Sequence, residues 1–98
     1  MRYDFDWDPR KAKANIRNHK VSFERATTTF RDPHLLSIPD DEHSESEERW
    51  ITMGLDESGS LLVLVHTFEN ILDDSARIRI ISARKATKKE TKNYEEGI

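Results

Sequence analysis

The sequence predicts an α+β fold: an N-terminal strand and two helices packed on a mainly antiparallel sheet, followed by a C-terminal helix. Three observations lead to this prediction. Residues 2–7 alternate aromatic and charged side chains, residues 8–33 contain start and stop signals for two helices, and residues 35–83 contain short apolar segments separated by turns. The 98 residues leave room for a single domain that spans residues 1–98.

The first helix is expected to begin at Asp8 and Pro9. The Asp8 side chain can accept hydrogen bonds from free backbone N–H groups, and proline at the first helical position loses no hydrogen bond. Ala12 and Ile16 are four residues apart, so we expect both to face the core, and whether His19 continues this inward stripe is left open. Residues 18–20 end the helix.

The second helix is expected to begin after Ser22, whose hydroxyl can cap it. The residues at helical spacing that should form its apolar stripe are Phe23, Ala26 and Phe30. The Asp-Pro pair at residues 32–33 ends the helix, because the residue before a proline avoids the α conformation.

Four further strands are expected, at residues 35–38, 49–55, 61–68 and 76–83. Residues 61–68 are apolar on both faces, which is typical of a central strand covered on both sides. Gly59 marks a hairpin turn at residues 56–60. Residues 70–75 are expected to be a polar connection.

The last helix has a clear start signal. Thr87 and Glu90 fit a capping box, and Gly97 is a suitable C-terminal stop. The helix has almost no apolar face, and Tyr94 is its single large contact residue. We therefore expect it to dock through Tyr94 or to meet a charged partner.

Charge is unevenly distributed along the chain, although the formal net charge is only −3. Residues 40–48 contain six carboxylates and no lysine or arginine, whereas residues 77–92 contain seven basic residues and one acid, Glu90. Such segregation creates a local field whatever the net charge is. The alternative interpretation of the basic segment is a solvated helix face.

Several classes of protein are excluded. The absence of cysteine excludes a disulfide framework, a zinc-thiolate site and a cysteine nucleophile. Residues 1–8 lack the apolar segment of a signal peptide. The longest uncharged apolar run, residues 61–65, is too short to cross a bilayer. We therefore expect a cytoplasmic protein without membrane contact.

Three blocks of the sequence resemble one family. The first is Phe-Asp-Trp-Asp-Pro at residues 5–9 with Lys11, Asn15 and residues 19–24; the second comprises residues 30–33, 37–40, His43 and 48–49; the third comprises residues 77–87, Glu90 and 94–95. In this order they resemble the BrnT toxins of bacterial type II toxin–antitoxin systems. Lys20 departs from the pattern, since many members have glycine there, and a lysine can leave the helix at a small conformational cost.

The resemblance implies a RelE-like fold and a ribonuclease that slows translation. It also implies neutralisation by a neighbouring BrnA-like antitoxin with a DNA-binding domain. Toxin and antitoxin would form a hetero-oligomer that represses its own promoter, so that promoter DNA is contacted only through the complex.

RNA carries its own nucleophile, the 2′-hydroxyl group. Cleavage then needs a base, cations for the charge on phosphorus and an acid for the leaving oxygen, and it needs no metal or other cofactor. The four histidines are scattered along the chain, at residues 19, 34, 43 and 66, so no metal site is expected. His43, within the acidic segment, is expected to be a solvated loop residue.

The leading catalytic candidates are Arg79 and Arg84, because the planar guanidinium group suits phosphate oxygens. Arg77 shares a strand face with Arg79. Both could instead belong to an exposed sheet face paired with acids. Lys85 and Lys88 could extend the patch toward RNA phosphates or serve only as solvated helix residues.

The acid and the base are left open. His66 would be the natural choice if its face also carries Arg79; otherwise it is a structural histidine. Tyr94 could stack on a base or donate a proton, or it could simply dock its helix. His19 could titrate in the site or cap its helix. Arg49 and Lys11 complete the predicted RNA-binding set.

Two other classes of function compete with an RNA-cleaving toxin. The basic segment fits a non-catalytic nucleic-acid-binding module or co-repressor subunit equally well. The charged last helix would suit a purely structural interaction domain.

Overall fold

The computed structural model describes residues 2–43 and 47–97, and the side chain of His43 and all of Glu45 lie outside the described residues. The predicted α+β class is confirmed, with helices packed on a mixed sheet. In chain order the elements are β1 (Arg2–Asp6), α1 (Pro9–His19), α2 (Phe23–Thr27), the 3-10 turn η1 (Thr28–Arg31), β2 (Leu36–Pro39), η2 (Asp41–His43), β3 (Arg49–Leu55), β4 (Leu61–Thr67), β5 (Glu69–Leu72), β6 (Ser75–Lys85) and α3 (Lys88–Glu96).

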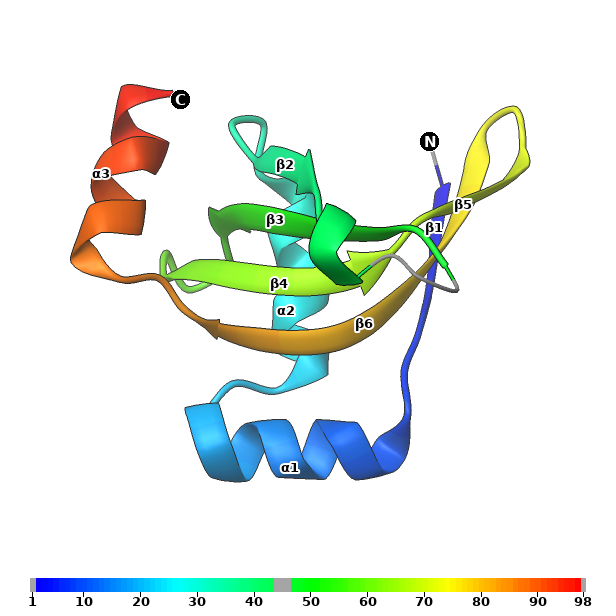
Figure 1. The fold of residues 1–98 in the computed structure, drawn as a ribbon, viewed down its shortest axis with the longest axis horizontal. Coiled ribbons are helices and arrows are strands. Elements are labelled where there is room, and N and C mark those ends of the chain that lie inside the picture. The colour runs from blue at the N-terminus through cyan, green and yellow to red at the C-terminus, as the bar shows by residue number, and fades with distance from the viewer. Residues whose placement is uncertain (1, 44–46, 98) are drawn as a thin grey trace.

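The sheet has the strand order β1-β6-β4-β3-β2, with β5 paired to β6 (Figure 1). The β2-β3, β3-β4 and β4-β6 pairs are antiparallel, as expected. The β5-β6 pair, which was not predicted, is also antiparallel. The β1-β6 pair is parallel and joins the N-terminal strand to the last strand. The sheet is therefore mainly antiparallel.

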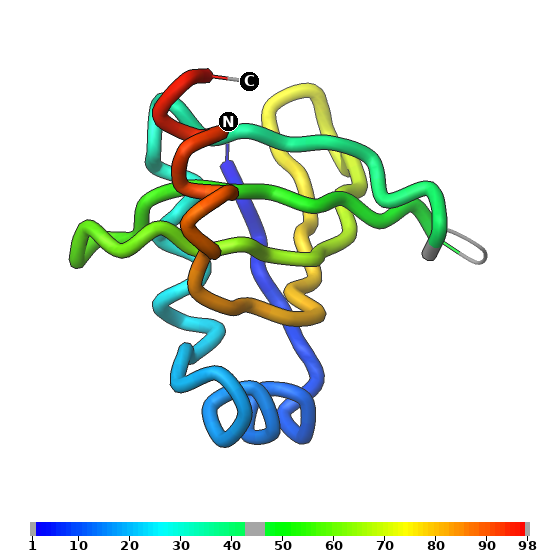
Figure 2. The backbone as a smooth tube through the Cα atoms, turned by 60° about the vertical axis from the view of Figure 1, so that its left-hand side comes forward, coloured from blue at the N-terminus to red at the C-terminus, as the bar shows by residue number. Residues whose placement is uncertain are grey.

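Helix α2 crosses one face of the sheet, and α1 lies alongside β6 (Figure 1). Figure 2 shows α3 standing crosswise at one end of the sheet, where β6 ends. The core lies between α2 and the sheet, with Trp7, Ala12 and Phe30 packed against it; its fully buried members are Val21, Phe23, Ala26, Leu62, Leu64, Ile78, Ile80 and Ala83. We call this side of the sheet the helix face.

The opposite side of the sheet, the arginine face, carries Arg49, Arg77, Arg79 and Arg84. Strand pairing fixes this assignment, because directly paired residues point to the same side. Arg49 pairs with Thr67 on β4, and the backbone N–H of Arg79 donates to the Thr67 hydroxyl. The helix face therefore carries the apolar core residues, whereas the arginine face carries these four basic side chains.

A β-bulge brings Arg84 to the arginine face. Arg79 and Arg84 are five residues apart, so regular alternation would place them on opposite faces. The register shifts between Val65, which pairs with Ser82, and His66, which pairs with Ile80. The extra residue resets the alternation, so that Arg84, which pairs with Val63, returns to the side of Arg79.

The predicted helix starts are confirmed, whereas the second helix ends earlier than predicted, at Thr27, and the 3-10 turn η1 continues it to Arg31. Asp8 accepts from the N–H of Arg10 at 2.8 Å, and Thr87 and Glu90 form the expected capping box. The C-cap of α1 is Lys20, in the left-handed conformation at φ 60°. A residue with a side chain thus occupies a position that favours glycine.

Residues 70–75 are not only a polar connection, and that prediction was wrong in part. Residues 69–72 form β5, which pairs with β6 as a hairpin at the end of the sheet opposite to α3 (Figure 1). All four residues of β5 are exposed. A strand with no buried face shows no alternation, which is the signal that sequence analysis depends on.

The prediction that α1 turns Ala12 and Ile16 toward the core was wrong in part. Ala12 packs against the core, but Ile16 is 48% exposed and Asn15 is the buried residue of the helix. The Asn15 amide nitrogen donates to the carbonyls of Val21 at 2.8 Å and Ala83 at 2.7 Å. Its carbonyl oxygen accepts from the N–H of Ala83. A polar side chain therefore joins α1 to β6.

Candidate functional site

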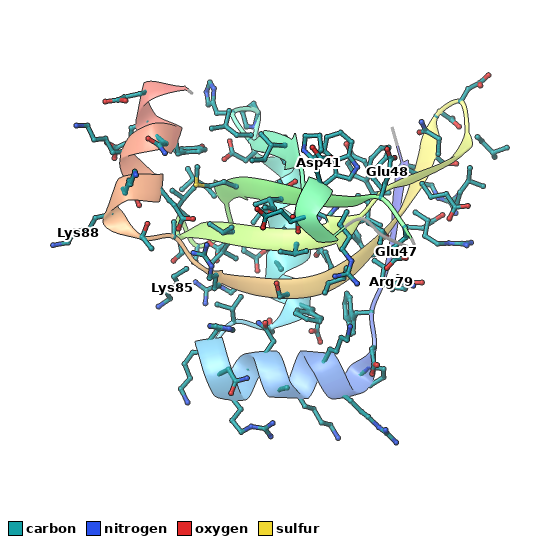
Figure 3. The ribbon with its side chains drawn as sticks, in the orientation of Figure 1. Asp41, Glu47, Glu48, Arg79, Lys85 and Lys88 are labelled. Carbon is teal, nitrogen blue, oxygen red and sulfur yellow. The ribbon has the colours of Figure 1, made fainter. Side chains whose placement is uncertain are left out.

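Arg79 lies in a cluster of charged side chains where β6, the start of β3 and the start of α1 meet. Its guanidinium group donates to both carboxylate oxygens of Glu47 (Figure 3). Arg49 Nη2 lies 3.8 Å from Glu47 Oε1. Lys11 and Asp8 line a hollow of about 170 Å³ with these residues. Glu47 thus faces cations from two strands and a helix.

A second hollow, of about 450 Å³, adjoins the first on the arginine face and shares Arg79 and Glu47 with it. Its other charged lining residues are Asp6, Glu48, Glu69 and Arg77. Two of the three carboxylates reach it through strand pairing, because Asp6 pairs with Arg79 and Glu69 pairs with Arg77. The face that carries Arg77 and Arg79 is exposed and accompanied by acids, which was the alternative interpretation of these arginines.

The charges of the two hollows are mixed. Among their described lining residues, five carboxylates outnumber four cations. The expected basic surface is therefore absent at this end of the sheet, among the residues that the structure describes. An anionic ligand would have to displace carboxylates, Glu47 in particular, before it could contact Arg79.

Arg84 belongs to a separate cluster. It donates from both Nη atoms to Glu90, at 2.8 and 2.9 Å. Hydrogen bonds from Arg84 outweigh desolvation and lower the pKa of Glu90 to about 2. The same pairing raises the pKa of Arg84. Lys85 and Lys88 are exposed beside it, and Figure 3 shows them at the opposite end of the sheet from Arg79.

The residues of the predicted site therefore form two separate groups at opposite ends of the sheet. Arg79 and Arg84 are five positions apart on β6, roughly 16 Å at the rise of an extended chain. The structure brings together Lys11, Arg49, Arg77 and Arg79 at one end. At the other end it brings together Arg84, Lys85 and Lys88, next to the start of α3.

His66 lies on the helix face, so the condition for its role as acid or base beside Arg79 is not met. It pairs with Ile80, the neighbour of Arg79 that points the other way. Its side chain is buried at 2% exposure, its Nδ1 is 2.9 Å from the carbonyl of Thr67, and burial lowers its pKa.

Tyr94 docks α3. Its hydroxyl donates to Asp32 Oδ2 at 2.5 Å, and burial together with this carboxylate raises the pKa of Tyr94 to about 12. His19 is exposed at the end of α1, eight residues and roughly 12 Å of helix from Lys11. Both side chains therefore lie away from the cluster around Arg79.

Glu47 is the residue that sequence analysis missed. It lies within the acidic segment at residues 40–48, and spacing does not distinguish it from the neighbouring carboxylates. The available signal was its position two residues before Arg49. Only the fold reveals that this carboxylate faces Arg79, which is 32 residues later in the chain.

Within residues 2–43 and 47–97, no group of three or more histidines and carboxylates is placed to hold a metal ion. In the same part of the chain, no helix is long and apolar enough to span a membrane.

Comparison with known proteins identifies the family. Residues 7–90 match the family described as the ribonuclease toxin BrnT of type II toxin–antitoxin systems. The crystal structure of the Brucella abortus ribonuclease toxin BrnT is similar in fold, with a TM-score of 0.61 and 16% sequence identity over 90% of this chain and 100% of that one. No curated protein matches the chain. Because the family match spans most of its length, the chain belongs to the BrnT family of ribonuclease toxins.

Proposed function

We propose that this chain is a metal-independent endoribonuclease toxin whose reaction centre is the cluster around Arg79 and Glu47. One observation carries the proposal: a carboxylate held by Arg79 lies among further cations, Arg49 and Lys11, in a hollow of the surface. A base next to phosphate-binding cations is what cleavage by the RNA 2′-hydroxyl requires.

In the proposed reaction, Glu47 accepts the proton of the 2′-hydroxyl group as its oxygen attacks phosphorus. The new bond is O2′–P, and the bond between phosphorus and the 5′-oxygen breaks. Arg79 and Arg49 stabilise the added negative charge on the phosphoryl oxygens. Lys11, in the same hollow, supplies the proton to the leaving oxygen. The products are a 2′,3′-cyclic phosphate and a free 5′-hydroxyl group.

The second cluster would hold the RNA rather than cut it. The bulge at residues 80–82 places Arg84 on the same face as Arg79, whereas Lys85 pairs with the core residue Leu62 and starts from the helix face. Lys88 is exposed at the start of α3. A single strand laid along the arginine face would meet cations at both ends, separated by a few nucleotides. We propose Arg84 and Lys88 as contacts for the flanking phosphates, with Lys85 adding positive charge at the end of β6 and Arg77 assisting at the reaction centre.

Incubation of the purified chain with single-stranded RNA in EDTA tests the proposal. We expect cyclic-phosphate ends, and we expect Arg79→Ala to lower kcat/KM by about 100-fold or more, since one transition-state contact contributes that much. Arg17→Ala, which removes an exposed charge of α1, is the matched control. Salt-sensitive RNA binding without cleavage would instead favour a non-catalytic nucleic-acid-binding subunit.

The role of Glu47 is tested separately. If Glu47 is the base, Glu47→Gln should lose cleavage and retain RNA affinity. Glu90→Gln removes the carboxylate partner of Arg84 in the same way and should keep cleavage. Faster cleavage by Glu47→Gln would contradict the assignment, because Glu47 would then only be restraining Arg79.

Membership of the family supports a proposal for the cellular setting of the activity. We propose a RelE-like toxin domain over residues 1–98 that acts in the cytoplasm and inhibits translation. A neighbouring BrnA-like antitoxin would neutralise it in a hetero-oligomer that represses its own promoter. Co-expression of the adjacent gene should restore growth; growth arrest that persists in its presence would contradict this partner.

A further inference from the structure

A small aromatic pocket opens on the helix face of the sheet. Its volume is about 220 Å³, and its wall includes Tyr3, Phe30, Trp50 and Phe68. Tyr3 is 37% exposed, and the other three rings are half-buried. Such a pocket suits one planar ring system, which could stack on these side chains.

One polar group of the pocket, Ser37, is the exposed end of a hydrogen-bonded chain. Its hydroxyl oxygen lies 2.6 Å from Thr52 Oγ1, which lies 2.6 Å from His66 Nε2. His66 Nδ1 lies 2.9 Å from the backbone carbonyl of Thr67. Thr52 and His66 are both buried, so the chain runs from the pocket into the protein interior.

The donors and acceptors of this chain can be assigned. A carbonyl only accepts, so Nδ1 of His66 carries the proton. Burial lowers the pKa of His66, which keeps the ring neutral and makes Nε2 an acceptor for the Thr52 hydroxyl. The Thr52 oxygen then accepts from Ser37. Ser37 has thereby used its proton and offers an oxygen acceptor to the occupant of the pocket.

Phe68 connects this pocket to the arginine cluster. The residue Phe68 contributes to the wall of both the aromatic pocket and the hollow that contains Arg77, Arg79 and Glu47. A nucleotide combines a planar ring with a phosphate at short range, and proteins that read single-stranded RNA stack its bases on aromatic side chains. The two sites therefore match the two halves of one ligand.

We propose that the aromatic pocket binds one nucleobase of the RNA, with the phosphate of that nucleotide on the arginine side of Phe68. This inference rests on the proposed function. The acceptor at Ser37 selects a base that presents an N–H donor, such as the exocyclic amino group of adenine. The pocket would thus give the enzyme a base preference next to the bond that it cleaves.

Binding of mononucleotides to the unsubstituted chain tests the proposal by amide NMR in EDTA. Adenosine 5′-monophosphate should shift the amides of Ser37, Trp50 and Phe68 in a saturable manner, and inorganic phosphate should leave them unchanged. Purine riboside 5′-monophosphate, which lacks the amino group, should bind about fivefold more weakly, the effect of one hydrogen bond. In Ser37→Ala the two nucleotides should bind equally.

Ile38→Ala is the matched control. Ile38 is next to Ser37 on β2 but points to the opposite face and is 60% exposed, so this variant should keep the preference for the amino group. The proposal is overturned if the nucleotide shifts only the amides of Arg77 and Arg79, as phosphate alone would. It is also overturned if only the antitoxin shifts the pocket amides, because the pocket would then be a protein-docking surface.

The inference and the proposed function can fail independently. If Ser37→Ala cleaves RNA with unchanged rate and base preference, the pocket proposal is wrong and the reaction centre stands. If the nucleotides bind as expected but RNA stays intact, the pocket proposal stands and the proposed cleavage is wrong.

Discussion

At the scale of single residues, Asn15 has an unusual structural role. On that side of β6, residues 75–79 pair with β1, whereas Ala83 lies beyond the end of β1. The amide of Asn15 bonds to both the N–H and the C=O of Ala83. A side chain thus takes the place of a neighbouring strand, because buried backbone groups need partners.

Asn15→Ala should destabilise the protein by about 2–4 kcal/mol, since it leaves buried backbone groups of Ala83 and Val21 without a partner. Urea unfolding measures the effect. Asn18→Ala, at an exposed position of the same helix, should change the free energy of unfolding by less than about 0.5 kcal/mol. Equal unfolding midpoints for the two variants would contradict this role.

Asp56, in the β3–β4 turn, couples stability to pH. Burial acts to raise its pKa, but hydrogen bonds from Ser58, Arg25 and Ser60 outweigh that effect and lower it to about 2. The folded state therefore favours the ionised carboxylate relative to the unfolded chain, whose pKa is 3.8. The resulting stability is present above pH 4 and is lost as the pH falls toward 2.

Asp56→Asn should accordingly lower the free energy of unfolding by about 2 kcal/mol at pH 7. The difference from the unsubstituted chain should shrink between pH 4 and pH 2. Denaturant unfolding at several pH values provides the measurement, with the exposed Glu57→Gln as control. A difference that does not vary with pH would show that the carboxylate charge is irrelevant.

At the scale of elements, α3 is held mainly at its two ends. The start of the helix is tied to β6, because Glu90 accepts from Arg84 and from the N–H of Thr87. Near its end, Tyr94 donates to Asp32, which also accepts from the N–H groups of Leu55 and His34. No residue of α3 is fully buried, so polar contacts rather than core packing position this helix.

Tyr94→Phe should therefore loosen the end of α3 and leave the sheet intact. We expect faster hydrogen exchange of the helix amides, by about tenfold or more, since a hydrogen bond to a carboxylate contributes about 1.5–3 kcal/mol. Lys92→Ala, at an exposed position of the same helix, should not change the exchange. Unaltered exchange in Tyr94→Phe would contradict docking through the hydroxyl group.

The sequence predicted most of the elements but not the shape of the site. Caps, turns and alternation are local signals, and they located the helix starts at Asp8, Ser22 and Thr87. The bulge that turns Arg84 toward the face of Arg79 depends on pairing with β4, which alternation cannot reveal. The partnership of Glu47 with Arg79 joins distant segments and therefore needed the folded chain.

At the scale of the whole molecule, the placement of charged residues on the surface bears more on RNA binding than the net charge of −3 does. Cations lie at both ends of the arginine face, and carboxylates accompany them. RNA binding would therefore exchange internal ion pairs for phosphate contacts. Such binding depends on ionic strength, because phosphate contacts release counterions.

We expect the logarithm of the RNA association constant to fall linearly with the logarithm of salt concentration. Arg79→Ala should reduce the slope by about one, the signature of one lost phosphate contact. Filter binding at several salt concentrations measures it. Lys13→Ala, on the exposed side of α1, should keep the slope, and an unchanged slope in Arg79→Ala would place the phosphate elsewhere.

The parallel pairing of β1 with β6 has a consequence for the synthesis of the protein. The cluster takes Asp6, Asp8 and Lys11 from one segment of the chain, but Arg77 and Arg79 from a strand that is translated much later than that segment. Pairing between such distant segments cannot begin until the ribosome has released β6. A nascent chain therefore lacks the assembled cluster for as long as β6 remains inside the ribosome.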